Sequence, residues 1–345
     1  MAVAVAAAAI SLFFFSPRLL VFTEEAPGSY EWTRGLNFVA QLEGQPLGEV
    51  EPALRHRLLP LHAAKLLGLQ GYSSFVLGWV GVLVLLVGTN LLLRNLGAPS
   101  TVAAASTFLL ASTGAVITSC GWLGILDCWW VFALILVALA PQWWLVGLAA
   151  LMAPWIDERF LIGLPAALVA RPLVYRFALR AAVGLLAVIA AAVLPYIGYR
   201  VYSLFWLPGD ASGEFISMQF VVWLRMAPHG WWMAYRLAWI FLLVPLFLPN
   251  ASRVKPWLIA LCCLPVVFAA IVTAADITRS AMVLAPLMMA GIIVAWRSYP
   301  VEITRLLPWI AAANFLVPYI HIVYNKMEPV HLLFWEIVRL VKKVG

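Results

Sequence analysis

The chain has 345 residues, of which 65% are hydrophobic and 11% are charged, and its mean hydropathy is +0.98. Soluble domains carry about 25% charged residues, so this composition excludes a soluble enzyme or binding module. The net charge of +7 does not indicate a nucleic-acid partner, because the Lys and Arg residues are scattered at the ends of apolar segments. Apolar segments recur almost end to end, which predicts one transmembrane domain over residues 1–345.

These apolar segments predict an all-α fold, a polytopic transmembrane helix bundle with about ten or eleven spans. A bilayer requires about 20 apolar residues per helical span, and helices satisfy their own backbone in lipid. The expected spans are 2–22, 73–94, 100–119, 124–140, 142–156, 160–171, 178–199, 231–249, 256–274, 280–296 and 306–324. We interpret 2–22 as a retained first helix rather than a cleaved signal peptide. The piece 160–171 is short enough to be a half-helix, and one span over 142–171 would invert every later loop.

Two long polar stretches interrupt the spans, at 23–74 and 200–230. Within the first, residues 52–67 have leucines at helical spacing, and the second has a similar pattern. The tail, residues 330–343, is a third amphipathic segment. We expect all three to form helices that lie in the membrane interface, in contact with lipid.

Positive charge predicts the orientation, because short cytoplasmic loops are enriched in Lys and Arg. A cytoplasmic N-terminus places most short basic loops inside, with 23–74 outside. The basic residues concerned are Arg94, Arg171, Arg176, Arg180, Arg253, Lys255, Arg297 and Arg305. This pattern is typical of a protein of the bacterial inner membrane.

Two acidic sites fall at the ends of spans on the predicted outer side. Glu24 and Glu25 follow the first span directly, and repulsion between adjacent carboxylates raises one pKa, which suits a general base or a metal ligand. Asp127 stands among apolar and aromatic residues, where an idle carboxylate is costly. The alternatives are a solvated helix end for the glutamates and a buried hydrogen bond for Asp127.

Two further charged groups interrupt apolar sequence on the same predicted side. Asp157, Glu158 and Arg159 stand within the apolar stretch 143–170, where they need a cavity or partners. Asp276 and Arg279 are spaced to share a helix face, and Arg is suited to bind phosphate oxygens. A solvated turn and a structural ion pair are the respective alternatives.

One more basic group belongs to this side. Arg57, with its neighbours Arg55 and His56, adds positive charge to the loop 23–74. The group can bind substrate or simply attract lipid headgroups.

This layout resembles the GT-C superfamily of membrane glycosyltransferases. Those proteins have a cytoplasmic N-terminus, a first helix that ends in an acidic pair, and a long outer loop with interfacial helices. Glu24-Glu25 and the stretch 23–74 match these features, and the sequences at 155–160 and 276–279 are similar to segments of bacterial membrane proteins of this type. The resemblance implies sugar transfer from a polyprenyl-phosphate carrier on the outer side of the membrane.

The resemblance also implies residue roles. Glu24 or Glu25 would be the catalytic base on the acceptor, and Asp127 and Asp157 would orient the acceptor. Arg159 and Arg279 would neutralise the leaving phosphate, and the remaining substrate-binding candidates are Glu158, Asp276 and Arg57. A divalent cation, Mg²⁺ or Mn²⁺, held by the aspartates is an open alternative, and the metal ligands are unknown. A transporter or lipid flippase, and a non-catalytic scaffold in an envelope-assembly complex, are the rival functions.

Overall fold

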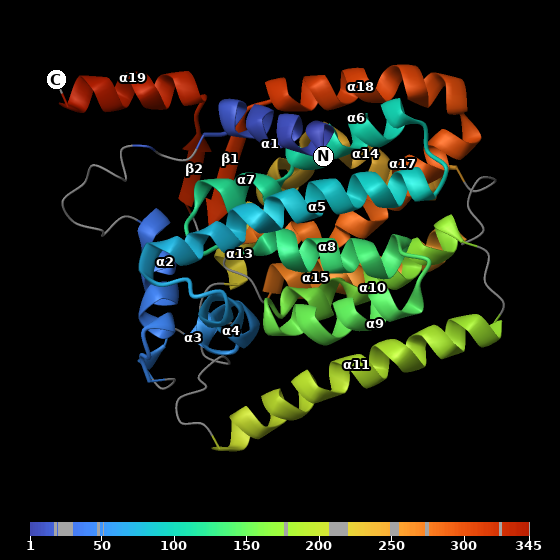
Figure 1. The fold of residues 1–345 in the computed structure, drawn as a ribbon. Coiled ribbons are helices and arrows are strands. Elements are labelled where there is room, and N and C mark those ends of the chain that lie inside the picture. The colour runs from blue at the N-terminus through green and yellow to red at the C-terminus, as the bar shows by residue number, and fades with distance from the viewer. Residues whose placement is uncertain are drawn as a thin grey trace.

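The fold was examined in a computed structural model of the whole chain, drawn in Figure 1. The structure describes residues 1–16, 19, 30–46, 49–50, 52–175, 179–206, 220–248, 255–272, 276–323 and 326–344. Glu24 and Glu25 therefore lie outside the described residues, and their predicted role stays a prediction.

Helices dominate the described chain, as the apolar composition predicts. They are α1 (Ala2–Phe14), α2 (Tyr30–Leu42), α3 (Pro52–Arg55), α4 (Leu58–Leu66), η3 (Gly71–Phe75), α5 (Val76–Asn95), α6 (Ser100–Ala111), α7 (Gly114–Gly121), α8 (Asp127–Leu139), α9 (Trp143–Met152), η4 (Ala153–Trp155), α10 (Arg159–Val174), α11 (Leu179–Trp206), α13 (Phe220–Tyr235), η5 (Arg236–Ala238), α14 (Trp239–Phe247), α15 (Pro256–Val272), α16 (Ile277–Ser280), η6 (Ala281–Leu284), α17 (Ala285–Ser298), α18 (Pro300–Leu316) and α19 (Leu333–Val344). The prediction of a helix bundle is confirmed at this level.

The long helices alternate in direction between two ends of the bundle (Figure 1). The connections 122–126, 156–158 and 317–318 lie at one end, which we call the Asp127 end. The connections 96–99, 140–142 and 299 lie at the other, which we call the Arg94 end. Because α9 and α10 are separate antiparallel helices, 142–171 is not one continuous span, and α10 is longer than the predicted half-helix.

Four helical stretches of the described chain are long and apolar enough to cross a membrane. They are Gly71–Asn95, Arg180–Trp206, Leu224–Phe247 and Ile277–Ser298. The pair α6 and α7, bent by 54° at residues 112–113, makes a fifth if it is one span. Large apolar side chains such as Phe205, Trp206 and Leu194 are exposed on α11, as expected of a lipid-facing helix. The full number of crossings, and the side on which the N-terminus lies, stay predictions.

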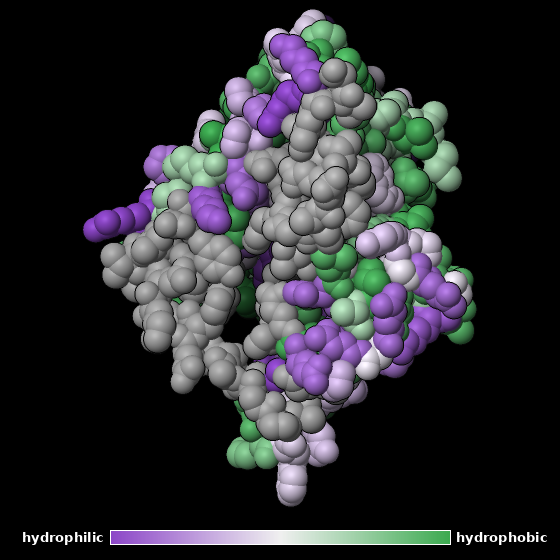
Figure 2. All heavy atoms as spheres, turned by 90° about the vertical axis from the view of Figure 1, so that its left-hand side faces the viewer, coloured by the Kyte–Doolittle hydropathy of each residue, from purple (hydrophilic) through white to green (hydrophobic). Residues whose placement is uncertain are grey.

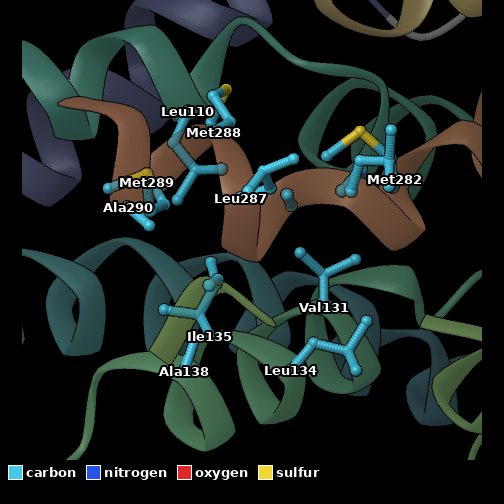
Figure 3. Packing of buried hydrophobic residues seen from close by; sticks show 14 of the residues in the cluster. Leu110, Val131, Leu134, Ile135, Ala138, Met282, Leu287, Met288, Met289 and Ala290 are labelled. Carbon is cyan, nitrogen blue, oxygen red and sulfur yellow. The ribbon is translucent and has the colours of Figure 1, made fainter. Parts of the chain in front are cut away.

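The core of the bundle lies between α8 and the segment η6–α17. Figure 3 shows the η6–α17 segment lying across α8, with Val131, Leu134 and Ile135 of α8 facing it and Met288 of α17 beside Leu110 of α6 on the other side. Residues 277–295 are all buried, so this segment is the central helix of the bundle. Its contact with α14 is very close, because a Cβ added at Gly291 would overlap the carbonyl oxygen of Phe241.

The predicted last span, 306–324, is wrong in its second half. Helix α18 ends at Leu316, and Pro318, which cannot donate a backbone hydrogen bond, follows. A hairpin of two antiparallel strands comes next, β1 (Tyr319–Val323) and β2 (Lys326–Val330). Thr278 of α16 fixes β1 through two hydrogen bonds, to the N–H (2.7 Å) and to the carbonyl oxygen (3.1 Å) of Ile322.

The polar stretches contain more helix than their hydropathy indicates. Helix α11 continues to Trp206 and α13 begins at Phe220, so much of the predicted loop 200–230 is helical. Residues 52–67 form two short helices, α3 and α4, rather than one. These segments gather at the Asp127 end, where many of the described residues are hydrophilic (Figure 2). Interfacial placement of α4 and α19 stays a prediction.

Candidate functional site: an acid–arginine cluster beside an apolar groove

Asp127 begins α8 and is fully buried. Its carboxylate accepts hydrogen bonds from Thr118 Oγ1 of α7 (3.2 Å) and from Trp130 Nε1 (3.0 Å). Arg279 of α16 binds both carboxylate oxygens, with Nε to Oδ2 at 2.5 Å and Nη2 to Oδ1 at 2.8 Å. The acid suits the positive N-terminal end of the helix dipole, and a bidentate arginine supplies its full counter-charge.

Asp276 is the second carboxylate that contacts Arg279. Its side chain caps α16 by accepting the backbone N–H of Arg279 (3.2 Å), and Arg279 Nη1 lies 3.3 Å from Oδ2. His321 of β1 approaches the same oxygen, with Nε2 at 3.3 Å, and its ring packs against that of Trp122 at 4.4 Å. Burial raises the pKa of Asp276, but the charges of His321 and Arg279 outweigh burial and lower it overall.

Asp157 lies in the turn between η4 and α10. It accepts three hydrogen bonds from Arg159, from the backbone N–H (3.0 Å), from Nε (2.9 Å) and from Nη2 (2.8 Å). Arg57, which precedes α4, places Nη2 3.0 Å from Oδ2. Burial raises the pKa of Asp157, but the two guanidinium groups outweigh it and lower the pKa to about 2. Arg159 also lies 3.6 Å from Asp127, which joins the two halves of the network.

We call these six residues the acid–arginine cluster. Its members are Asp127, Asp157, Asp276, Arg57, Arg159 and Arg279. Three carboxylates face three guanidinium groups, so the cluster is neutral when His321 is neutral. Buried charges are stable when they are paired and hydrogen-bonded, so the carboxylates of the cluster stay ionised and bound to its arginines. Such carboxylates orient neighbouring groups better than they accept protons from a substrate.

Glu158 points away from the cluster, unlike its two neighbours in sequence. Its side chain is 48% exposed, and Arg200 of α11 lies 3.1 Å from Oε1. One turn before Arg200, Tyr196 and Tyr199 pack against Trp155 of η4, with ring centroids 5.0 and 5.1 Å apart. The C-terminal half of α11 therefore brings an arginine and two aromatic rings to the edge of the cluster.

An apolar groove opens at the surface beside these residues. It has a volume of about 300 Å³ and is lined by Leu58, Leu59, His62, Leu151, Met152 and Trp155. Two lining residues are close in the chain to the ion pair of Arg57 and Asp157, because Leu58 directly follows Arg57 and Trp155 precedes Asp157 by two positions. Figure 1 shows α4 beside the end of α9 at which the groove forms. The groove and the acid–arginine cluster therefore lie at the same end of the bundle.

The structure brings together most of the residues that the sequence singled out. Asp127, Asp157, Arg159, Asp276 and Arg279 meet at one end of the bundle. Glu158 stands apart from them, and the roles of Glu24 and Glu25 stay predictions. The neighbours of Arg57 do not face lipid headgroups, because Arg55 and His56 are buried.

Sequence reasoning missed Arg236, which stands inside the predicted span 231–249. It is fully buried at the break between α13 and α14, in a left-handed backbone conformation with φ of +49°. Its guanidinium donates to the carbonyl oxygens of Ser112 and, at 3.4 Å, of Val317, which end α6 and α18. It lies over the rings of Phe15 (4.6 Å) and Tyr319 (5.4 Å). The sequence does carry a signal for Arg236, because an ionisable residue within an apolar run indicates a functional or structural role.

No group of three His, Cys, Asp or Glu side chains within the described ranges is placed to hold a metal ion. The aspartates that the sequence offered as ligands are bound by arginines. No family model, curated protein or solved structure matches the chain.

Proposed function

We propose that the chain is a membrane glycosyltransferase of the GT-C type, which takes a sugar from a polyprenyl-phosphate donor at the Asp127 end. The observation that carries the proposal is the mostly apolar groove beside α4, at the end of the bundle that holds the acid–arginine cluster. A prenyl chain fits an apolar, surface-open groove, and a phosphate fits arginines near it. His62 and Trp155 bring the polar atoms of the lining, which is otherwise aliphatic and suits a lipid better than a water-soluble sugar nucleotide.

The solvent exposure of each arginine decides whether it can bind the phosphate of the donor. Arg279 is held by Asp127 and Asp276 and is buried, so it orients the cluster rather than binding substrate. Arg57, which directly precedes Leu58 of the groove, is 18% exposed, and Arg200, which pairs with Glu158, is 21% exposed. In the proposed mechanism Arg57 and Arg200 stabilise the negative charge that grows on the departing phosphate.

The proposed reaction forms a bond between an acceptor hydroxyl oxygen and the anomeric carbon of the sugar. The bond from that carbon to the phosphate oxygen breaks, and polyprenyl phosphate leaves with the electron pair. A carboxylate takes the hydroxyl proton. Glu24 or Glu25 remains the predicted base, and Glu158 is the exposed carboxylate of the described site.

The direct test uses the full chain in lipid nanodiscs with a panel of polyprenyl-phosphate sugars, and measures the release of polyprenyl phosphate. Glu158→Gln and Glu24→Gln/Glu25→Gln identify the base, because loss of a general base lowers the rate by about 10²–10⁴-fold. Glu302→Gln, at the exposed start of α18 at the Arg94 end, is the matched control and should leave the rate unchanged.

The groove has its own test. Leu59→Trp fills it and should raise the KM for the donor, whereas Leu194→Trp on the exposed face of α11 should not. Absence of donor turnover with the whole panel would contradict the proposal. If the chain then binds other envelope proteins, it is a scaffold.

A transporter or flippase is the second candidate, because two broken helices meet inside the bundle. The breaks at residues 112–113 and at Arg236 resemble the discontinuous helices that line transport sites. Arg236, however, is already bound by backbone carbonyls at the ends of α6 and α18, which act as its counter-charge. Movement of a labelled polyprenyl phosphate across the bilayer, without its turnover, would favour this candidate.

A further inference from the structure

Helix α19 exposes its apolar face. Phe334, Ile337 and Val341 follow one another at helical spacing and form one stripe, with exposures of 59%, 45% and 65%. We call these three residues the α19 stripe. In a helix that packs on its own protein such a stripe normally faces the core, so here it lacks the cover that its composition predicts.

The polar face of α19 is turned toward the protein instead. Glu336 is fully buried and accepts the backbone N–H of Leu19 (3.2 Å) and Nη1 of Arg339 (3.0 Å). Just before the helix, the carbonyl oxygen of His331 accepts the N–H of Ser16 (3.0 Å). Polar contacts at the end of α1 therefore anchor the tail, and they leave the α19 stripe facing outward.

The exposed charges of α19 are positive. Its one acid, Glu336, is buried, whereas Arg339 and Lys342 are exposed, and Lys343 adds a third basic residue to the sequence. An apolar stripe bordered by basic residues is typical of helices that bind anionic membrane surfaces. A second copy of the chain would bring like charges together, so the charge favours lipid over self-association.

We propose that α19 docks on the membrane surface at the Asp127 end, with the α19 stripe among the lipid chains and its basic residues on anionic headgroups. Figure 1 shows α19 extending beyond the bundle at that end. In the same view α19 runs roughly parallel to α1 and α18, so docking requires the helix to turn about His331 and Leu332, which separate it from β2, and to release the contact of Glu336 with Leu19. This docking is independent of the proposed sugar transfer.

The test is a spin label placed at position 341 in the full chain, compared with one at position 342 on the polar face. Oxygen and a water-soluble nickel complex report whether each label lies in lipid or in water. In vesicles with one third phosphatidylglycerol, we expect Val341→Cys to be lipid-exposed and Lys342→Cys to be water-exposed. The labelled chain without an added cysteine corrects for the natural thiols.

The dependence of docking on charge distinguishes binding to lipid from association with a second copy. Each basic residue near an anionic surface strengthens binding about fivefold, so Arg339→Gln/Lys342→Gln/Lys343→Gln should weaken docking by about 10². Pure phosphatidylcholine should likewise move the label at 341 into water. A label at 341 that is water-exposed in both membranes overturns the proposal. Shielding from both reagents, with spin–spin broadening that grows with protein density, also overturns it and assigns the stripe to a second copy.

Discussion

Replacing Asp127 with Asn should destabilise the bundle strongly, because it removes the carboxylate that neutralises Arg279. The substitution keeps the size of the side chain, and its one oxygen can still accept the hydrogen bond from Trp130 while its NH2 group donates to the hydroxyl of Thr118. It removes two short charge-assisted bonds and leaves Arg279 buried with Asp276 alone. Breaking a buried ion pair from one side costs about 3–5 kcal/mol. Since Asp276 remains 3.3 Å away, we expect a cost of about 3 kcal/mol.

Thiol reactivity offers an assay that uses the natural chain. Cys120, Cys128 and Cys263 are free and buried, so a thiol-reactive dye reports global unfolding in detergent. Free energies come from the same variants unfolded in mixed micelles of increasing denaturing-detergent content. Glu302→Gln at the Arg94 end is the control, and its effect should stay within about 0.5 kcal/mol.

A double-mutant cycle separates pairing from other effects. Arg279→Gln leaves Asp127 with Arg159 at 3.6 Å, and the double variant Asp127→Asn/Arg279→Gln leaves no unpaired charge between the two positions. We expect the double variant to be more stable than the sum of the single effects predicts, by about 1–3 kcal/mol. A cycle with no coupling, or an Asp127→Asn protein of normal stability with no activity, would refute the pairing argument and make Asp127 a catalytic carboxylate.

Three further predictions follow from other contacts. Gly291→Ala should prevent close packing of α14 on α17, because the added Cβ would overlap the carbonyl oxygen of Phe241; a loss of several kcal/mol or of folded protein in a thermal scan checks it. Lowering the pH should remove the contribution of ionised Asp157 to the free energy of unfolding. This contribution is present above about pH 5 and is lost as the pH falls from about 4 through 2. The folded pKa near 2 against about 3.9 unfolded corresponds to about 2–3 kcal/mol, and Asp157→Asn should flatten the pH dependence of unfolding in this window. Arg236→Met should destabilise the bundle by about 2–4 kcal/mol in the same unfolding assay, because it leaves the carbonyl oxygens that Arg236 binds without a donor.

The sequence indicated which charged residues are costly to bury, but not which of them form ion pairs with one another. Asp127 and Arg279 were both singled out because each interrupts apolar sequence. They are 152 positions apart, and their contact depends on α8 and α16 meeting at one end of the bundle. Hydropathy fixes neither the order of helices around a bundle nor their rotation. The pairing of Asp157 with Arg57 could not be predicted from the sequence for the same reason.

The errors in the predicted elements have local causes. A hydropathy window cannot separate the strand Tyr319–Val323 from a helix, because aromatic and β-branched residues are as apolar as leucine. The predicted span 178–199 ends before Arg200, yet α11 continues to Trp206 because a helix tolerates polar residues at its exposed end. Arg236 was overlooked because the surrounding apolar run was long enough to hide one charge in the average.

The neutrality of the acid–arginine cluster bears directly on how a charged substrate could use this end of the bundle. A phosphate that displaced Asp127 from Arg279 would leave a buried carboxylate without its partner, at a cost of several kcal/mol. A phosphate at Arg57 or Arg200 meets guanidinium groups that keep contact with solvent, so it can share them with Asp157 and Glu158 without stripping a buried acid. The buried half of the cluster is therefore suited to hold α8, α10 and α16 in place. The accessible half, next to the apolar groove, is where binding energy for a lipid phosphate can arise, and substitutions in the two halves should separate into losses of stability and losses of donor affinity.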